Sequence, residues 1–178
     1  MVGRRSFAQG RWDLPRHGSH VAQLWTLGGL SRVHPMDTFF EIRGSDFDVE
    51  DALRPSTLSE RAKRWRRGES VGSSGKHVFR DSGFSVCIGG GDECDLDRQV
   101  ADAMEFLRVE SSEIRRLRAL PEIEKTCLRF GEVWPKGIFG RSPLLPSQLL
   151  LACGQLGLDI VLCQYLETGI SDDDKKST

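Results

Sequence analysis

Residues 96–130 read LDRQVADAMEFLRVESSEIRRLRALPEIEKTCLRF, and this stretch decides the fold class. Its apolar residues recur at a spacing of about 3.6 and predict one amphipathic helix that ends before Pro121. The stripe consists of Val100, Ala103, Met104, Leu107, Ile114, Leu117 and Leu120. It weakens at 110–112, where the pattern allows a kink or two shorter helices. Residues 123–130 then alternate as a strand does, with Leu128 and Phe130 on one face.

The chain before this helix predicts further strands and one short helix. Residues 38–43 alternate, with Phe40 and Ile42 on one face and Glu41 and Arg43 on the other. This alternation predicts a half-buried strand. A short helix capped by Asp46 or Asp48 is expected to follow and to end near Leu53. Residues 77–80 and 84–88, joined by an Asp-Ser-Gly turn, predict a hairpin.

The chain after this stretch predicts one more helix and one more strand. Residues 146–156 form a helical pattern that ends at Gly157, which is the usual residue at this position. Residues 158–165 are almost continuously apolar, which is typical of a strand in the middle of a sheet. A short strand near 138–139 is also expected. The fold is therefore predicted as α+β in the order β-α-β-β-α-β-(β)-α-β, with a mainly antiparallel sheet and helices packed on one face.

The charge of the chain divides it into parts. Residues 1–35 hold five arginines and one aspartate, a net charge of +4, whereas residues 36–178 hold 20 basic and 25 acidic residues, a net charge of −5. We expect 1–35 to be a flexible basic leader, with Met36 as an alternative translation start. Residues 36–168 form the predicted single domain, and the acidic and basic end of the chain, 169–178, is predicted to be disordered.

Several classes of protein are disfavoured by composition. No apolar run approaches the length of a membrane-spanning helix, so no membrane association is expected. The five cysteines form an odd set without a C-x-x-C pair, which favours reduced thiols and a cytoplasmic location: Cys87, Cys94, Cys127, Cys153 and Cys163. Because His77 is the only histidine after residue 36, a zinc site is disfavoured, and no metal or other cofactor is predicted.

Two glycine-containing motifs give no catalytic prediction. Residues 68–72 match G-x-S-x-G, but Ser70 lies in a loop-like setting and lacks an acid and a histidine in the usual order. Residues 89–91 are three glycines between a strand and a helix, where a phosphate can bind. The acidic residues that follow would repel a phosphate. No catalytic residue is therefore assigned.

Clusters of acidic residues are the first candidate binding sites. We predict that they contact a protein partner, with a first patch of Asp46, Asp48, Glu50 and Asp51 and a second of Asp92, Glu93 and Asp95. Because both clusters lie near helix starts, capping and favourable interaction with the helix dipole are the simpler explanation of these carboxylates. Paired carboxylates could also serve a metal-dependent or acid–base enzyme, which is a third alternative.

The basic run at 61–67 is the second candidate site. It places five cations around Trp65, and Arg64, Trp65, Arg66 and Arg67 could contact phosphates and stack on bases. The competing interpretation is a solvated edge of the domain whose cations offset nearby carboxylates, with Trp65 packed inward. Without these five cations, residues 36–178 carry 15 basic and 25 acidic residues, a net charge of −10.

These elements together resemble an uncharacterised bacterial domain-of-unknown-function family. The similarity rests on G-x-D-x-D at 44–48, on W-R-R-G-E at 65–69, and on the order of the elements from about 37 to 166. It implies a small α+β fold and assigns no catalytic residue. Some relatives resemble immunity proteins that are encoded beside secreted toxins.

The leading functional prediction is therefore a non-enzymatic, cytoplasmic protein-binding module, most simply an immunity protein that neutralises a bacterial toxin. An acidic protein would associate rapidly with a basic toxin that acts on nucleic acid. The alternative is a nucleic-acid-binding regulator that uses the basic run. The oligomeric state is not predicted.

Overall fold

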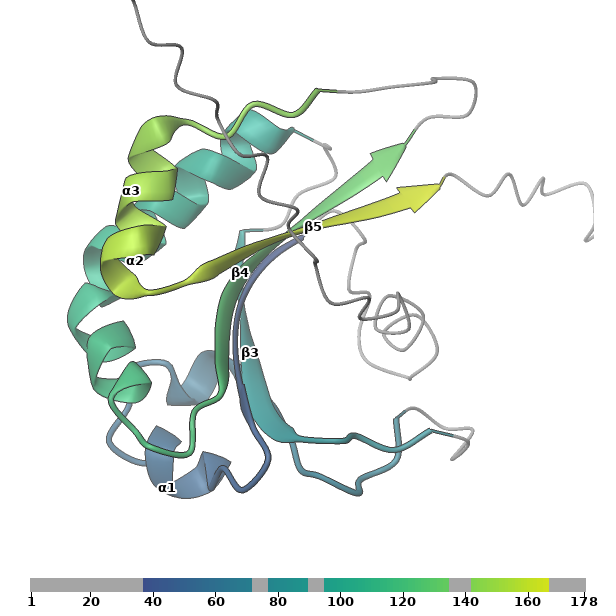
Figure 1. Ribbon diagram of the computed structural model, residues 1–178, viewed down its shortest axis with the longest axis vertical. Coiled ribbons are helices and arrows are strands. Elements are labelled where there is room, and N and C mark those ends of the chain that lie inside the picture. Colours follow the sequence, from purple (N-terminus) through teal and green to yellow (C-terminus); the bar gives the residue numbers. More distant parts are fainter. Residues whose placement is uncertain (1–36, 72–76, 90–94, 135–141, 167–178) are drawn as a thin grey trace, which may run out of the picture.

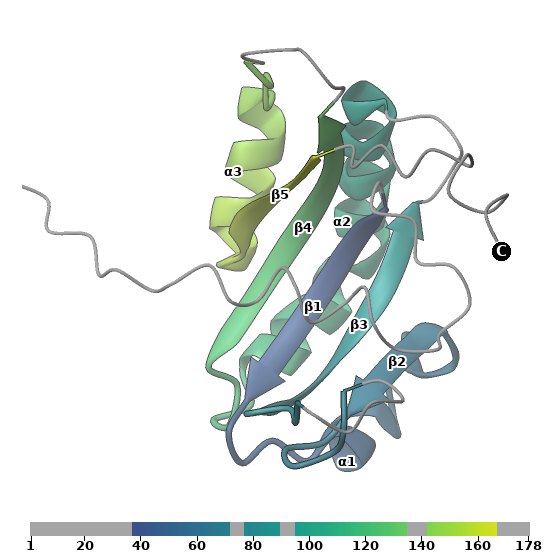
Figure 2. The same cartoon turned by 90° about the vertical axis from the view of Figure 1, so that its right-hand side faces the viewer.

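A five-stranded sheet with three α-helices on one of its faces forms the fold (Figures 1 and 2). The computed structural model describes residues 37–71, 77–89, 95–134 and 142–166. The strands are β1 (Thr38–Gly44), β2 (Ala62–Trp65), β3 (Ser82–Gly89), β4 (Lys125–Trp134) and β5 (Asp159–Leu166). The helices are α1 (Val49–Leu53), a 3-10 turn at Ser59–Arg61, α2 (Leu96–Arg118) and α3 (Ser147–Leu156).

The strand order is β2-β3-β1-β4-β5. Neighbouring strands are antiparallel except for β4 and β5, which are parallel. A parallel pair needs a crossover connection, and α3 lies in that connection. The predicted α+β class, the mainly antiparallel sheet and the placement of the helices on one face are confirmed.

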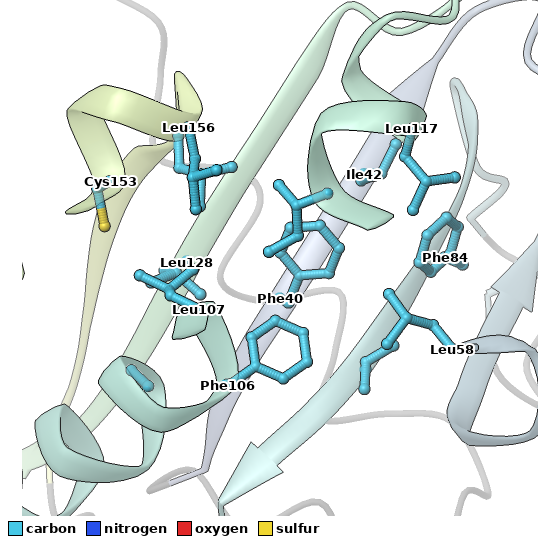
Figure 3. Close-up of a cluster of buried hydrophobic side chains, with 14 of the residues drawn as sticks. Phe40, Ile42, Leu58, Phe84, Phe106, Leu107, Leu117, Leu128, Cys153 and Leu156 are labelled. Carbon is cyan, nitrogen blue, oxygen red and sulfur yellow. The ribbon is translucent and has the colours of Figure 1, made fainter. Parts of the chain in front are cut away.

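The core lies between the sheet and the helices (Figure 3). Phe40 and Ile42 of β1 are fully buried, and their partners in register are Val86 and Phe84 of β3. The Phe40 ring lies 5.5 Å from that of Phe106 and 6.3 Å from that of Phe84, measured between centroids. The alternation of β1 therefore directs these two residues toward the helices, as predicted.

The helix α2 is continuous over 23 residues, so the break at 110–112 does not occur. Most of the predicted stripe is buried against the sheet, while Met104 and Leu120 are partly buried. A buried amide fixes one end of the helix: Gln99 accepts a bond from the Thr38 hydroxyl at 3.0 Å and donates to the Gly131 carbonyl at 2.9 Å. These bonds join α2 to β1 and β4.

The predicted hairpin of 77–80 with 84–88 is wrong. The strand that pairs with β3 is β2, which comes from the basic run, with Ala62 opposite Val86 and Trp65 opposite Gly83. Residues 77–80 contribute only an isolated bridge between Ser70 and Val78. Charged residues tolerate an edge position because one side of the strand remains in water, and this explains how a basic segment forms a strand.

The central position predicted for residues 158–165 is also wrong. β5 lies at the edge of the sheet, beside β4 alone among the described strands. The predicted strand near 138–139 falls outside the described residues, as do the leader 1–35, the tail 169–178, and Cys94. Among the described helices, none is both long and apolar enough to cross a membrane.

The described cysteines are free thiols. Cys127 and Cys153 are buried, and Cys163 is half-buried. Burial raises the pKa of Cys127 to about 11, and burial likewise raises that of Cys153 to about 11. Cys87 is exposed. A thiol is alkylated only when it is deprotonated to the thiolate and accessible to the reagent.

We expect iodoacetamide to label Cys87 in the native protein well before Cys127 and Cys153, which should react only on unfolding. Peptide mapping by mass spectrometry after a timed alkylation measures the order. Labelling of Cys127 or Cys153 at the rate of Cys87 in the folded protein would contradict their burial.

Candidate functional site

The predicted acidic patch and the basic run lie together at the α1 end of the sheet (Figure 2). Glu50 of α1 lies 3.8 Å from Arg64 and 3.8 Å from Arg66, and Asp46 lies 4.0 Å from Arg67, measured between charged atoms. We call these residues and their neighbours the α1-end surface: Asp46, Glu50, Asp51, Arg54, Arg64, Arg66 and Arg67. Two candidate sites predicted separately therefore form one surface of mixed charge.

Local sequence explains why α1 presents its acids outward. Asp48 caps the helix, because its Oδ1 accepts the backbone N–H groups of Glu50 and Asp51 at 3.1 Å each. Val49, Ala52 and Leu53 are buried toward the core. The side chain of Asp48 is thus committed to the fold, whereas Glu50 and Asp51 extend to solvent.

The ion pairs of the α1-end surface are weak. The Asp46 side chain is 92% exposed and that of Arg67 is 61% exposed, and the contacts of Glu50 are at the long limit of an ion pair. Exposed pairs of this kind contribute little to stability, because water and salt screen them. Their charges are therefore accessible to a binding partner.

Trp65 is not part of this exposed surface. Only 4% of it is accessible, and its ring stacks on Phe79 at 5.6 Å between centroids and lies 5.8 Å from the Arg43 guanidinium. Its indole N–H donates to the Asp81 carboxylate at 3.2 Å. Stacking on a nucleic-acid base would require the ring to leave this position.

A groove of about 590 Å³ adjoins the α1-end surface, between α1 and the end of α2. Its apolar floor includes Phe47, Ala52 and Leu120, and its rim carries carboxylates and guanidinium groups. The lining residues are Phe47, Asp48, Asp51, Ala52, Arg54, Pro55, Arg116, Leu120 and Glu122. An apolar floor with a charged rim suits insertion of an amphipathic side chain from another molecule.

Arg116 connects the two helices that border the groove. It donates to both oxygens of Glu113 at 2.7 Å each and to the Ala52 carbonyl of α1 at 2.8 Å, so it ties α1 to α2. These hydrogen bonds from Arg116 lower the pKa of the Glu113 carboxyl below its usual value of 4.5.

The Glu113–Arg116 pair should make stability depend on pH in acid. A lowered native pKa stabilises the fold above about pH 4.5, and this contribution is lost as the pH falls through the native pKa. We expect the difference in urea midpoint between the wild type and Glu113→Gln to be largest near neutral pH and to shrink in acid. A difference that stays constant with pH would contradict this role.

Asp95, the one residue of the second predicted patch that the structure describes, does not join the α1-end surface. Asp95 caps the start of α2, where its Oδ1 accepts the Asp97 backbone N–H at 2.9 Å. The 23 residues of α2 separate it from the groove by about 34 Å, at 1.5 Å a residue. Asp92 and Glu93 lie outside the described residues.

A buried ion cluster that the sequence did not predict lies on the face of the sheet opposite the helices, as the alternation of β1 requires. We call this face, whose strands Figure 2 shows, the second face. Glu41 is 1% exposed and accepts hydrogen bonds from Arg43, its neighbour but one on β1, and from Arg129 of β4. Arg43 also lies 3.8 Å from Asp81. Burial lowers the pKa of Arg43, but the charge and hydrogen bond of Glu41 outweigh it, so the pKa is raised overall.

The cluster joins β1 to β4. Both Glu41 oxygens accept hydrogen bonds from guanidinium groups, and Cys127, its partner in register on β4, has a pKa raised to about 11 by burial. Across the ranges that the structure describes, no group of three or more histidine, cysteine, aspartate or glutamate side chains could hold a metal ion. Ser70, the centre of the G-x-S-x-G match, is exposed in the bridge to Val78.

Comparisons with protein-family models, with curated proteins and with solved structures found no match. The resemblance to a bacterial domain-of-unknown-function family therefore stays a prediction.

Proposed function

We propose that the protein is a non-enzymatic binding module that docks onto a partner protein through the α1-end surface. The observation that supports this most strongly is the combination of exposed charge and an apolar groove at one end of the sheet. Protein interfaces typically have an apolar centre that excludes water and a polar rim that fixes orientation.

The exposed charges supply the rim. Asp46, Glu50 and Asp51 can exchange their weak internal partners, Arg67, Arg66 and Arg54, for cations of another protein at little cost. The released arginines can then pair with carboxylates of the partner. A surface of this kind orients a partner of complementary mixed charge and speeds its association.

The partner class that we propose is a bacterial toxin domain with a basic active site, which makes the protein an immunity protein of the cytoplasm. Its support is electrostatic: outside the leader and the basic run, the chain carries an excess of ten acidic residues. On the α1-end surface, which is of mixed charge, Asp46, Glu50 and Asp51 are the carboxylates placed to meet a basic site. Toxins that act on nucleic acid need a basic site, and an acidic protein can cover it.

The alternative, a nucleic-acid-binding regulator, has less support. Trp65 is buried, so base stacking is lost and only phosphate contacts of Arg64, Arg66 and Arg67 would remain, in competition with Glu50 and Asp46. Such binding would weaken steeply with salt.

Co-expression with the product of the adjacent upstream gene tests the proposal. We expect the two proteins to co-purify, and Asp46→Lys/Glu50→Lys/Asp51→Lys to abolish co-purification while the fold is retained. Asp48 is left unchanged because it caps α1. Glu105→Lys, on an exposed turn of α2, is the matched control. Failure of the wild type to co-purify, or equal loss in the control, would contradict the proposal.

A further inference from the structure

β5 is an edge strand with the composition of a central one. After Asp159 it contains no charged residue and no proline, reading Ile-Val-Leu-Cys-Gln-Tyr-Leu over 160–166. The described strands leave its outer edge without a neighbour. Edge strands ordinarily avoid association by being short or by carrying charges. β2, at the other edge, follows this rule, since it has four residues, of which two are Lys63 and Arg64.

The helix beside β5 adds exposed leucines to the same edge of the molecule. Six large apolar side chains are exposed among the described residues, and four of them belong to α3, β5 or the segment that leads into α3. They are Leu144 at 81%, Leu150 at 49%, Leu151 at 63% and Leu162 at 41% exposed. Figures 1 and 2 show α3 and β5 together at this edge.

We infer that a second copy of this chain covers this edge, with β5 of one protomer antiparallel to β5 of the other. A two-fold axis normal to the sheet pairs the strand with itself, so that the same faces of both copies coincide and both α3 helices lie on one side. The outward N–H and C=O groups of β5, which no described strand pairs, then complete a ladder across the interface.

Charge and size both favour a second copy over an unrelated strand. The edge carries one charged side chain, Asp159, at the end of the strand, so that antiparallel self-pairing places no like charges opposite each other. The elements at this edge, β5, α3 and residues 142–146, hold 23 residues, of which Leu149, Cys153 and Leu156 are buried in the core, so about 20 remain. That is the lower end of the roughly 20–30 residues a side of a stable interface.

This interface is independent of the proposed function, because β5 and β2 occupy opposite edges of the sheet. The α1-end surface lies beside β2 and stays exposed in the dimer. The Asp46→Lys/Glu50→Lys/Asp51→Lys variant should therefore remain dimeric although it loses the partner.

Sedimentation velocity of the full chain over a range of concentrations tests the inference. We expect a species of twice the chain mass of 19.9 kDa. Leu162→Lys and Leu151→Lys should shift it to the mass of the monomer, with Leu151→Lys as the variant that leaves the strand unchanged. Val109→Lys, at a site 55% exposed on α2, is the matched control and should remain dimeric.

Three results would overturn the inference. The first is a wild type that sediments as a monomer at every concentration, which is also the outcome expected if only a different protein covers β5. The second is a Leu151→Lys variant that keeps the mass of the dimer while its circular dichroism shows the native fold. The third is a Val109→Lys variant that dissociates as far as the β5 and α3 variants do.

Discussion

Glu41→Ala is expected to lower the free energy of unfolding by about 3–5 kcal/mol, which is the usual cost of removing one partner from a buried ion pair. The carboxylate is 1% exposed and lies between Arg43 and Arg129, so its loss leaves two guanidinium groups on the second face without their shared counter-ion. Urea denaturation followed by circular dichroism measures the change.

Glu41→Gln separates charge from shape. We expect most of the loss to persist, because the amide is neutral and its NH₂ group faces a guanidinium donor. Glu105→Gln is the matched control, because Glu105 pairs with Arg108 on the exposed side of α2. The urea midpoint of this variant should stay within error of that of the wild type. A Glu41→Ala midpoint equal to that of the control would show that the cluster does not stabilise the sheet.

Phe40→Ala should destabilise the fold by about 3–5 kcal/mol, since truncation of a buried aromatic side chain removes its burial and leaves a cavity. The ring is fully buried in the centre of β1 and contacts both Phe84 and Phe106, so it joins the sheet to α2 (Figure 3). The same urea titration gives the value.

Phe39→Ala is the control for the face of β1 on which the truncated side chain lies. Phe39 is the preceding residue, only half-buried on the second face, and its truncation should cost clearly less. An equal or larger loss for Phe39→Ala would mean that the principal core is not on the helix side of β1.

The parts of the fold that could be predicted from the sequence have local signals. The long stripe of α2 and the alternation of Phe40 and Ile42 arise from periodicity that a short window contains. The end of α3 at Gly157 could also be predicted, because the residue adopts φ of 66°, a left-handed conformation that favours glycine.

The errors arose where long-range pairing decides the structure. Glu41 is paired with Arg129, which is 88 residues away in the sequence. When the neighbouring strands are unknown, the alternation of β1 predicts that the face carrying Glu41 is exposed to solvent. β2 was missed because its charges resemble a loop, although an edge position accepts them. β5 was placed centrally because its apolar composition is typical of a central strand. Composition does not reveal which strands are its neighbours.

The candidate site was partly predictable. Glu50 and Arg66 were each identified, but as members of separate sites, since only the fold places α1 beside β2. The groove had no sequence signal, because its lining combines Phe47 and Ala52 with Leu120, which follows the end of α2.

Amide hydrogen exchange of the purified chain, alone and in complex with the co-expressed partner, tests whether a partner protein binds the α1-end surface. We expect slower exchange in the complex at α1 and β2, with β5 equally protected in both states. Protection confined to β5 or to the start of α2, with α1 and β2 unchanged, would contradict it.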